Sequence, residues 1–394
     1  MKVFRQVEMN SKNAINCLKV VHIHNNTKFI NGTSRFEGPF FENKIIIIGK
    51  KGNYKGIYEN TALYLKPTPG NVKKIIEICN TSDLVVFYDL NNIKSYIANQ
   101  LYGKTKMAWR FFGLELYGKL PQVVYSDLTQ KARKKDWITF LKEISKKKIK
   151  KLGSFLKWKK SFNPEFDKAI SNIDFFLGFC QEEYDLLKSY WKELPGFVQL
   201  PIAPRKKITP NPEKTNLIIV GNNRSAYNNH LDILKIIESN SNKSAHFLMP
   251  FNYGVETNYS KMVREKANKI ANLELLENFL PNEKYEKVFF DAQAAIFNGF
   301  RQMAMANVIF ALENGVKLYL NIKNPVYQWL KKEGFLIFST EDFKKDLKTD
   351  QLKLTNKEAR YNAEQLIRLT ENYTLEDFQK KLYNAIISDS PLKT

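Results

Sequence analysis

The sequence has few residues of the types that build metal sites or disulfide frameworks. It contains three cysteines and four histidines in 394 residues. Cys17, Cys79 and Cys180 lie far apart, with no C-x-x-C pair, which is typical of reduced thiols in a cytosolic protein. No spacing of histidine and cysteine resembles a metal-ligand set, and no D-x-D triplet occurs that could hold a metal-bound diphosphate. We therefore expect no metal and no cofactor.

Long apolar runs are also missing from the sequence. No run approaches the roughly 20 apolar residues of a membrane-spanning helix, and the first residues lack the apolar core of a signal peptide. We therefore expect a soluble, cytoplasmic chain. There is no Walker loop, no G-x-S-x-G elbow and no G-x-G-x-x-G fingerprint, so none of these motif-defined active sites is indicated.

The composition indicates a globular protein with a strong positive charge. Hydrophobic residues make up 43% and aromatic residues 13% of the chain, which excludes a disordered protein. The formal net charge is +22, which attracts polyanions such as nucleic acid, an acidic membrane surface or phosphorylated ligands. At this length two domains are expected, because a single core rarely grows so large.

Short apolar runs alternate with amphipathic helical stretches along nearly the whole chain. The runs "LKVVHIH" and "DLVVFYDL" in the first half, and "NLIIVGN" and "AHFLMPF" in the second, are typical of buried parallel strands. Strand–helix–strand alternation predicts an α/β fold of two Rossmann-like, doubly wound parallel-sheet domains facing a cleft. The proline-rich stretch 200–215 is typical of a linker, centred near residue 207. We predict an N-terminal domain over 1–203, a C-terminal domain over 212–370 and a C-terminal helix over 371–394.

Residues 131–160 depart from this alternation. They carry 13 Lys or Arg against two acidic residues, a net charge of +11, interleaved with apolar residues at approximate helical spacing. Three interpretations stay open: a solvated helical pair, a helix on an anionic membrane, or a nucleic-acid groove. No recognised nucleic-acid motif accompanies the charge, so we expect no nucleic acid and favour the anionic inner-membrane surface.

Polar loops follow three predicted strands of the C-terminal domain, where parallel sheets bind ligands. The first is "GNNRSAYNNH" after "LIIV", the second follows "HFLMP", and the third begins with Arg301 before a helix. A helix start beside an arginine is suited to a diphosphate. An ordinary βα turn would also explain the first loop, but three such loops on one edge favour a nucleotide-diphosphate pocket. The predicted donor-binding residues are Gly221, Asn222, Arg224, Asn228, Tyr253, Arg301 and Gln302.

The N-terminal domain offers candidates for a general base. Glu115 follows Gly113 just past the strand-like run "KMAWRFF", although a capping or salt-bridged glutamate would look the same. His24, at the end of "VVHIH", is the rival candidate, although such histidines more often belong to the core. The carboxylate of Glu115 or the imidazole of His24 could take the proton of an acceptor hydroxyl.

With these residues in view, the chain resembles the 4-acetamido-4,6-dideoxygalactose (Fuc4NAc) transferase family. The segment "WRFFGLELY" is similar to that family's Trp…Gly-x-Asp-Leu-Tyr pattern, with Glu115 at the Asp position. The segment "VGNNRSAYNNH" is similar to its Val-Gly-Asn…Asn-x-His pattern, and "FNGFRQ" and "NPVYQ" have counterparts in the same order. The chain departs from the family pattern at two places. Other residues, beginning with Met303, replace the family's glycines after the Arg-Gln pair. The first βα loop lacks an acidic residue. The likeness runs from about 105 to 330.

The resemblance implies a GT-B fold and a metal-independent, inverting glycosyltransferase. The family passes a TDP-sugar to a polyprenyl-diphosphate-linked disaccharide in enterobacterial common antigen synthesis. Glu313 stands alone where retaining enzymes carry an E-x7-E pattern, which favours inversion. By the resemblance, Glu115 is the base, and we assign acceptor binding to Trp109, Arg110 and Tyr117 of the same motif.

The expected substrates are a TDP- or UDP-linked sugar, Fuc4NAc-like or a related hexose, and a polyprenyl-diphosphate-linked saccharide. We expect the enzyme on the inner face of the cell membrane, as a peripheral protein of surface polysaccharide synthesis. A nucleotide-sugar 2-epimerase of the same fold would need several acidic residues around the sugar, and few occur at these strand ends. A basic nucleic-acid-binding protein is the non-enzymatic alternative. Selective thermal stabilisation by nucleoside diphosphates over oligonucleotides would separate the two classes.

Overall fold

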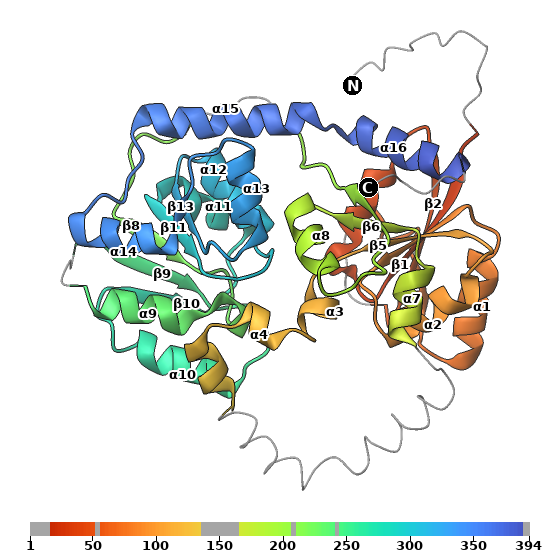
Figure 1. Cartoon of the computed structure of the whole chain (residues 1–394), viewed down its shortest axis with the longest axis horizontal. Helices are drawn as coiled ribbons and strands as arrows, with labels where there is room; N and C mark the ends of the chain where they lie inside the picture. Colours follow the sequence, from red (N-terminus) through yellow and green to blue (C-terminus); the bar gives the residue numbers. More distant parts are fainter. Residues whose placement is uncertain (1–15, 52–55, 135–164, 206–209, 241–243, 389–394) are drawn as a thin grey trace, which may run out of the picture. The chain divides into compact units, whose positions relative to one another are not determined.

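The computed structural model describes residues 16–51, 56–134, 165–205, 210–240 and 244–388 (Figure 1). Two compact units divide the chain. The first unit takes in the described residues of Met1–Arg110, Asn163–Phe176 and Glu376–Thr394, and the second those of Phe111–Phe162 and Leu177–Leu375. Two parallel-sheet α/β domains are present, as the alternation of apolar runs and helical stretches predicted, and the first unit holds most of one sheet while the second holds all of the other.

The N-terminal sheet has seven strands in the order β3-β2-β1-β4-β5-β6-β7. Its strands are β1 Leu18–His24, β2 Phe41–Ile48, β3 Leu63–Leu65, β4 Leu84–Tyr88, β5 Lys106–Arg110, β6 Phe175–Gly178 and β7 Gly196–Gln199. The pairs β1–β2, β1–β4, β2–β3 and β4–β5 are parallel. The order places β1 near the middle, with successive strands added to either side, which is the doubly wound arrangement.

The C-terminal sheet has six strands in the order β10-β9-β8-β11-β12-β13, and all five pairs are parallel. Its strands are β8 Leu217–Val220, β9 His246–Pro250, β10 Leu273–Leu276, β11 Ala294–Phe297, β12 Lys317–Leu320 and β13 Phe338–Ser339. The strand order reverses at β8 and β11. Open α/β sheets bind ligands at such a reversal, beyond the carboxyl ends of the strands.

Helices connect the strands. They are α1 Pro69–Cys79, α2 Asn92–Leu101, α3 Leu114–Tyr117, α4 Pro121–Val124, α7 Phe166–Asn172, α8 Gln181–Lys188, α9 His230–Glu238, α10 Asn258–Ala267, α11 Asn282–Asp291, α12 Met305–Glu313, α13 Pro325–Lys332, α14 Thr340–Thr349, α15 Asn356–Asn372 and α16 Leu375–Ile387. Two 3-10 helices, η1 Thr27–Phe36 and η2 Ala226–Asn228, lie in loops.

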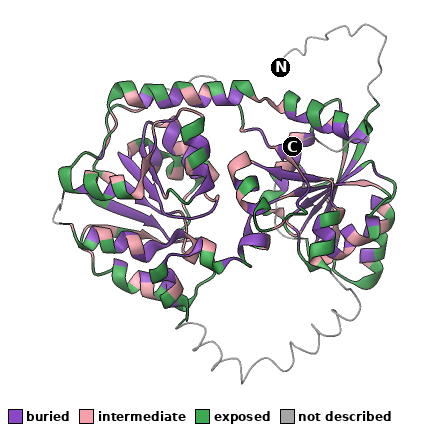
Figure 2. Cartoon of the chain, in the orientation of Figure 1, coloured by how far each residue is buried: buried purple, intermediate pink, exposed green. Residues whose placement is uncertain are grey.

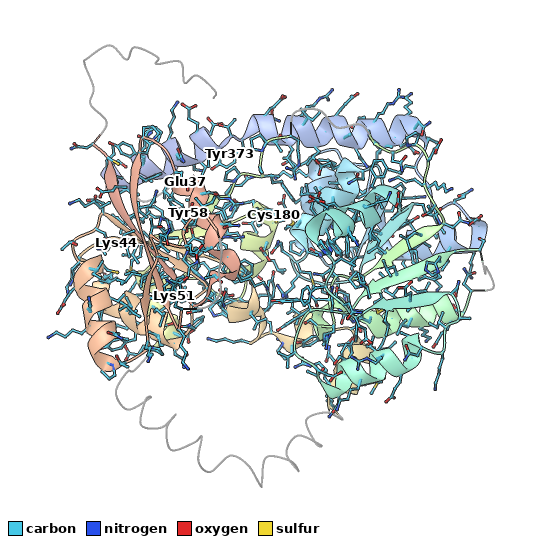
Figure 3. All side chains as sticks on the ribbon, turned by 180° about the vertical axis from the view of Figure 1, so that it is seen from behind. Glu37, Lys44, Lys51, Tyr58, Cys180 and Tyr373 are labelled. Atoms are coloured by element: carbon cyan, nitrogen blue, oxygen red, sulfur yellow. The ribbon has the colours of Figure 1, made fainter. Side chains whose placement is uncertain are left out.

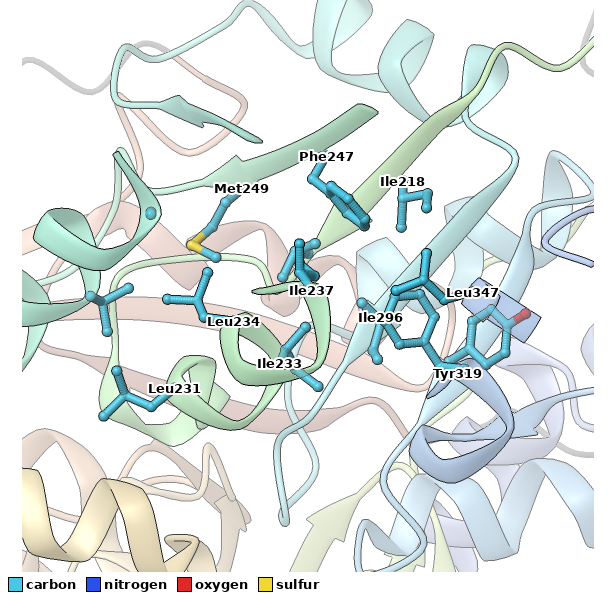
Figure 4. Packing of buried hydrophobic residues seen from close by; sticks show 14 of the residues in the cluster. Ile218, Leu231, Ile233, Leu234, Ile237, Phe247, Met249, Ile296, Tyr319 and Leu347 are labelled. Carbon is cyan, nitrogen blue, oxygen red and sulfur yellow. The ribbon is translucent and has the colours of Figure 1, made fainter. Parts of the chain in front are cut away.

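The second unit buries both faces of its sheet, because successive strand residues point to opposite sides. On one face, Ile218 lies near Phe247 in a cluster that also holds Leu234 and Ile237 of α9 (Figure 4). Ile219 packs on the other face with residues of α12, α13 and α15, including Leu312. The continuous apolar run "LIIV" therefore reflects a strand covered on both sides. Figure 2 shows the same arrangement as buried strands beneath helices with exposed outer faces.

Helix α16 belongs to the first unit. The Gln379 side-chain amide donates to the backbone oxygens of Arg35 and Glu37, at 2.9 and 2.8 Å. The Glu37 carboxylate also accepts a hydrogen bond from the Tyr58 hydroxyl (Figure 3). The end of the chain thus fixes the loop between β1 and β2.

Candidate functional site

The turn after β8 requires glycine. Gly221 has φ +67°, a left-handed conformation that L side chains rarely adopt. A Cβ there would lie 3.2 Å from Asn228 Oδ1 and 3.3 Å from His230 Nε2. The Gly221 N–H donates to the Ile296 oxygen of the neighbouring strand β11 at 2.9 Å. Gly221 therefore lets the loop leave the sheet with these two side chains against the backbone.

The loop 222–229 is held mostly by its own polar groups and by the end of β9. The Arg224 N–H donates to the Tyr253 oxygen at 3.0 Å, and its Nε donates to the Phe251 oxygen at 2.8 Å. The Asn228 amide nitrogen donates to the Asn223 oxygen at 3.1 Å. The many amides of this loop thus first serve to fix its shape. Arg224 also joins the loop that follows β8 to the loop that follows β9.

Several buried polar atoms in this loop have no hydrogen-bond partner. Within the described parts of the chain they are Asn222 Oδ1, Asn228 Oδ1 and both ring nitrogens of His230. Asn228 is 2% exposed and His230 is 1% exposed. Burial lowers the pKa of His230 to about 4, opposed in part by the Asn223 backbone, so this imidazole is neutral at physiological pH.

Arg301 follows β11 and contacts the rings of two tyrosines. Its guanidinium carbon is 4.5 Å from the centre of the Tyr227 ring and 5.7 Å from that of Tyr117. Its Nη1 donates to the Gln302 oxygen at 3.0 Å, whereas its buried Nε has no partner among the residues that the structure describes. The side chain is 8% exposed. The two tyrosine rings contact the guanidinium, and its Nε remains available as a donor.

Helix α12 begins four residues after Arg301 without a side-chain cap. Its N-cap, Ala304, has φ +58° and no polar side chain. The first amides of such a helix point outward unsatisfied, and its dipole favours negative charge. Together with Arg301 this start is suited to an anion, and the diphosphate site stays a prediction. Gln302, the neighbouring predicted residue, is half-buried.

Gly113 allows Arg301 to approach the segment that carries Glu115. Gly113 has φ +102°, and a Cβ there would lie only 2.4 Å from Arg301 Nη1. Glu115 is half-buried in the first turn of α3, and its Oε1 accepts from the Phe112 N–H at 3.5 Å. The sequence placed Glu115 in the N-terminal domain, but its contacts group it with the second unit, which holds the predicted donor loops.

Residues 124–126 fix this segment to the start of α9. The Asn229 side chain accepts from the Ser126 N–H at 2.9 Å and donates to the Val124 oxygen at 3.2 Å. The rings of Tyr125 and Tyr227 stack at 5.1 Å with an interplanar angle of 20°. The loop after β8 and the segment around Glu115 therefore form one packed structure. Tyr227 and Asn229 were missed as site residues, although an aromatic ring within a polar loop was a visible signal.

The three residues predicted to bind an acceptor differ in accessibility. Trp109 is fully buried, and its ring meets Phe176 edge-on at 5.4 Å. Tyr117 is fully buried as well, and its hydroxyl donates to Glu183 at 3.1 Å. Arg110 is half-buried at the end of β5. In this structure Trp109 packs the core and Tyr117 supports Arg301, so of the three only Arg110 presents accessible surface.

His24 lies in the first unit, at the end of β1. It is 1% exposed, stacks on Tyr88 at 3.8 Å and lies 3.2 Å from the Thr33 hydroxyl. Burial lowers its pKa to about 2, with smaller contributions from the charges of His22 and Lys94. A neutral, buried imidazole with so low a pKa is a weak proton acceptor, so Glu115 is the better candidate base.

Three expectations concern the basic segment, a metal site and a membrane-spanning helix. The basic segment 131–160 lies outside them except for residues 131–134, which are helical. The described residues include no group of three or more His, Cys, Asp or Glu side chains that could hold a metal ion. In the same part of the chain, no helix combines the length and the apolar composition needed to cross a membrane.

Several solved structures with the same fold are glycosyltransferases. Sucrose-phosphate synthase from Thermosynechococcus elongatus superposes with a TM-score of 0.63 at 9% identity, covering 95% of this chain and 100% of that chain. HepE of Anabaena, solved with UDP and glucose, gives 0.64 at 8% identity, covering 94% and 100%. The lipopolysaccharide outer core galactosyltransferase WaaB gives 0.57 at 10% identity, covering 95% and 100%. These likenesses show the fold, which is GT-B.

Fold and sequence together define the class: the chain is a glycosyltransferase. Residues 197–383 match the family described as 4-alpha-L-fucosyltransferase, glycosyl transferase group 56. This match confirms the resemblance that the motifs of the C-terminal half suggested. The motif from Trp109 to Tyr117 lies outside the matched residues.

Proposed function

We propose that this enzyme moves a sugar from a nucleotide diphosphate to a polyprenyl-diphosphate-linked saccharide, with inversion and without a metal. The donor is a TDP- or UDP-linked sugar, Fuc4NAc-like or a related hexose, and the product belongs to a bacterial surface polysaccharide. The observation that carries the proposal is Arg301, which contacts the rings of Tyr117 and Tyr227 with its Nε available and lies four residues before the uncapped start of α12. The family match supports the sugar chemistry.

Replacing Arg301 tests the proposed diphosphate site. Arg301→Ala removes a charge-assisted hydrogen bond worth about 1.5–3 kcal/mol, which corresponds to roughly a 10- to 150-fold loss of affinity for UDP or TDP. Isothermal titration calorimetry measures the loss. Arg360→Ala is the matched control, because Arg360 is exposed on α15 and its loss changes the net charge equally. Equal nucleotide affinity in both variants would place the diphosphate elsewhere.

We further propose that Glu115 is the general base. Inversion by direct displacement needs one group that takes the acceptor hydroxyl proton as the oxygen attacks the anomeric carbon. The position of Glu115 supports this role, because Gly113, two residues before it, touches the arginine assigned to the leaving diphosphate. No metal is then required, since Arg301 and the α12 dipole oppose the charge on the leaving group.

Glu115→Gln keeps the shape of the side chain and removes the base. We expect turnover to fall about 10²- to 10⁴-fold while donor affinity is unchanged. His24→Ala is the control, and we expect its effect to be limited to the stability of the first unit. An active Glu115→Gln enzyme beside an inactive but folded His24→Ala enzyme would transfer the role to the histidine.

We also propose that residues 131–160 bind the enzyme to an anionic membrane near its lipid-linked acceptor. The support is the net charge of +11 in thirty residues, since each basic residue near such a surface contributes about 1 kcal/mol. Five lysines of this segment are replaced with Gln for the test: Lys146, Lys147, Lys148, Lys150 and Lys151. The matched control replaces five exposed lysines of the second unit: Lys331, Lys344, Lys345, Lys348 and Lys357.

Flotation with vesicles that contain anionic lipid measures the binding. We expect the first variant to float poorly and the control variant to float like the wild type. High salt should reproduce the loss, because exposed charges are screened beyond about 8–10 Å. Flotation that does not depend on anionic lipid would instead support a solvated helical pair.

A further inference from the structure

The side chain of Asn228 presents a buried acceptor beside Gly221. Its amide nitrogen donates to the Asn223 oxygen, the Asn223 side-chain oxygen and the Ser225 oxygen, at 3.1, 3.0 and 3.4 Å. These three acceptors fix the orientation of the amide, since its oxygen would repel them. The remaining atom, Oδ1, is therefore an acceptor, and none of the residues that the structure describes donates to it.

His230 adds a second set of unused groups at the same place. It is the first residue of α9 and is 1% exposed. Neither ring nitrogen meets hydrogen-bond geometry with a described residue, although the Asn223 backbone lies near enough to raise the pKa of the ring. Because the ring is neutral, one nitrogen accepts and the other donates. His230 Nε2 and Asn228 Oδ1 lie 3.3 and 3.2 Å from the point where a Cβ of residue 221 would stand. Both groups thus meet at the Gly221 turn.

Folded proteins rarely leave such groups unsatisfied, because a buried acceptor without a donor loses the hydrogen bonds that it made to water. The third unused acceptor of the turn is Asn222 Oδ1, on a half-buried side chain. Among the buried groups of this turn that have no hydrogen-bond partner, acceptors therefore outnumber donors. An ordered water or a ligand group that donates hydrogen bonds would satisfy them.

Whether a group of the site donates or accepts hydrogen bonds determines which part of a nucleotide sugar it can bind. An ionised diphosphate offers acceptor oxygens, so it matches Arg301 Nε and the first amides of α12, which are donors. It cannot satisfy Asn228 Oδ1. A sugar offers hydroxyl groups, and an acetamido sugar also offers an N–H, which are donors.

We propose that Asn222, Asn228 and His230 form a subsite for a hydroxyl or amide N–H of the donor's sugar part, separate from the diphosphate site at Arg301. This inference rests on the proposed function, because it divides the same donor between two neighbouring loops. The loop after β8 recognises sugar, and the loop after β11 recognises phosphate. The hydrogen-bond donor comes from the transferred sugar or from the ribose of the nucleoside, which share this chemistry.

The test compares three probes on the full-length enzyme: inorganic pyrophosphate, UDP and UDP-glucose, with TDP and TDP-glucose in parallel. His230→Phe keeps a planar ring and removes both nitrogens. We expect it to leave pyrophosphate affinity unchanged and to weaken binding of the nucleotide sugar roughly 3- to 10-fold. His230→Gln, which keeps one donor and one acceptor, should restore part of the affinity. Arg301→Ala should weaken all probes, pyrophosphate included.

The nucleoside diphosphates identify the source of the hydroxyl group. A loss confined to UDP-glucose and TDP-glucose assigns the subsite to the transferred sugar, whereas an equal loss for UDP assigns it to the ribose. Unchanged nucleotide-sugar binding, or a loss that includes pyrophosphate, overturns the proposal and leaves a water-filled structural site. Asn222→Ala, on the half-buried side chain, repeats the test if His230→Phe does not fold. If the wild-type enzyme binds none of the nucleotide probes, the proposed function fails instead.

Discussion

The contact between Gly113 and Arg301 predicts an unusual effect of adding one methyl group. In Gly113→Ala the new Cβ would lie 2.4 Å from Arg301 Nη1, well inside the roughly 3.5 Å at which such atoms normally touch. Nη1 is the far end of a flexible side chain, so the guanidinium can move away at small steric cost. The substitution should therefore displace Arg301 from its two tyrosine contacts and leave the fold intact.

Two magnitudes follow from the structure. The φ of +102° imposes a strain on alanine of about 1–3 kcal/mol in the free energy of unfolding. Displacing Arg301 removes its charged hydrogen bond to the diphosphate, about 1.5–3 kcal/mol, or roughly 10- to 150-fold in the affinity for UDP or TDP. Gly103→Ala is the matched control, because Gly103 also has a positive φ, +72°, but a Cβ there has no neighbour within 4 Å. It should lose stability without losing affinity.

A double-mutant cycle measured by calorimetry decides the question. Once Arg301 has been replaced with alanine, the atom that clashes is gone, so adding Gly113→Ala should cause little further loss of nucleotide affinity. The two single losses would then be strongly non-additive. Additive losses, or a Gly113→Ala enzyme with wild-type affinity, would refute the idea that Gly113 positions the arginine.

Two further predictions concern stability. Ser126→Ala removes the hydroxyl that donates to the Asp232 carboxylate, and should lower the free energy of unfolding by about 1–3 kcal/mol in urea titrations, with exposed Ser171→Ala as the control. Burial lowers the pKa of three histidines, so the unfolded chain binds more protons than the folded chain below about pH 6.5, and the free energy of unfolding should fall as pH decreases towards 4. For each of these histidines in the unit that unfolds, the free energy of unfolding should change by up to about 1.4 kcal/mol per pH unit, which corresponds to the uptake of one proton. A free energy of unfolding that does not change over this pH range would contradict the burial of these rings. These histidines are His22, His24 and His230.

The sheet strands were predictable where burial leaves a continuous apolar run. The runs at β1, β4, β8 and β9 were predicted as strands, because strands covered on both faces need apolar residues at nearly every position. The three-residue strand β3 was missed, since Leu63–Leu65 is too short to show a period and is followed by Lys66 and Pro67. Helix α3 is likewise a single turn that no periodicity marks.

The site was predictable in its loops but not in its packing. The polar residues after β8, β9 and β11 could be placed because the carboxyl ends of parallel strands share an edge. The contact between Ser126 and Asn229 joins residues 103 apart, and no local pattern predicts such a pair. Trp109 and Tyr117 looked like binding residues because aromatic rings occur in binding sites and cores alike, and only the folded chain shows them buried.

The most direct test of the proposed mechanism is the stereochemistry of transfer by the purified enzyme. UDP- and TDP-sugars are offered with polyprenyl-diphosphate-linked saccharides, and NMR reads the configuration at the anomeric carbon of the product. The mechanism predicts an inverted product from the wild-type enzyme, and Glu115→Gln should bind the donor normally while forming product about 10²- to 10⁴-fold more slowly. A product with retained configuration, or wild-type turnover rates in Glu115→Gln, would contradict direct displacement assisted by Glu115.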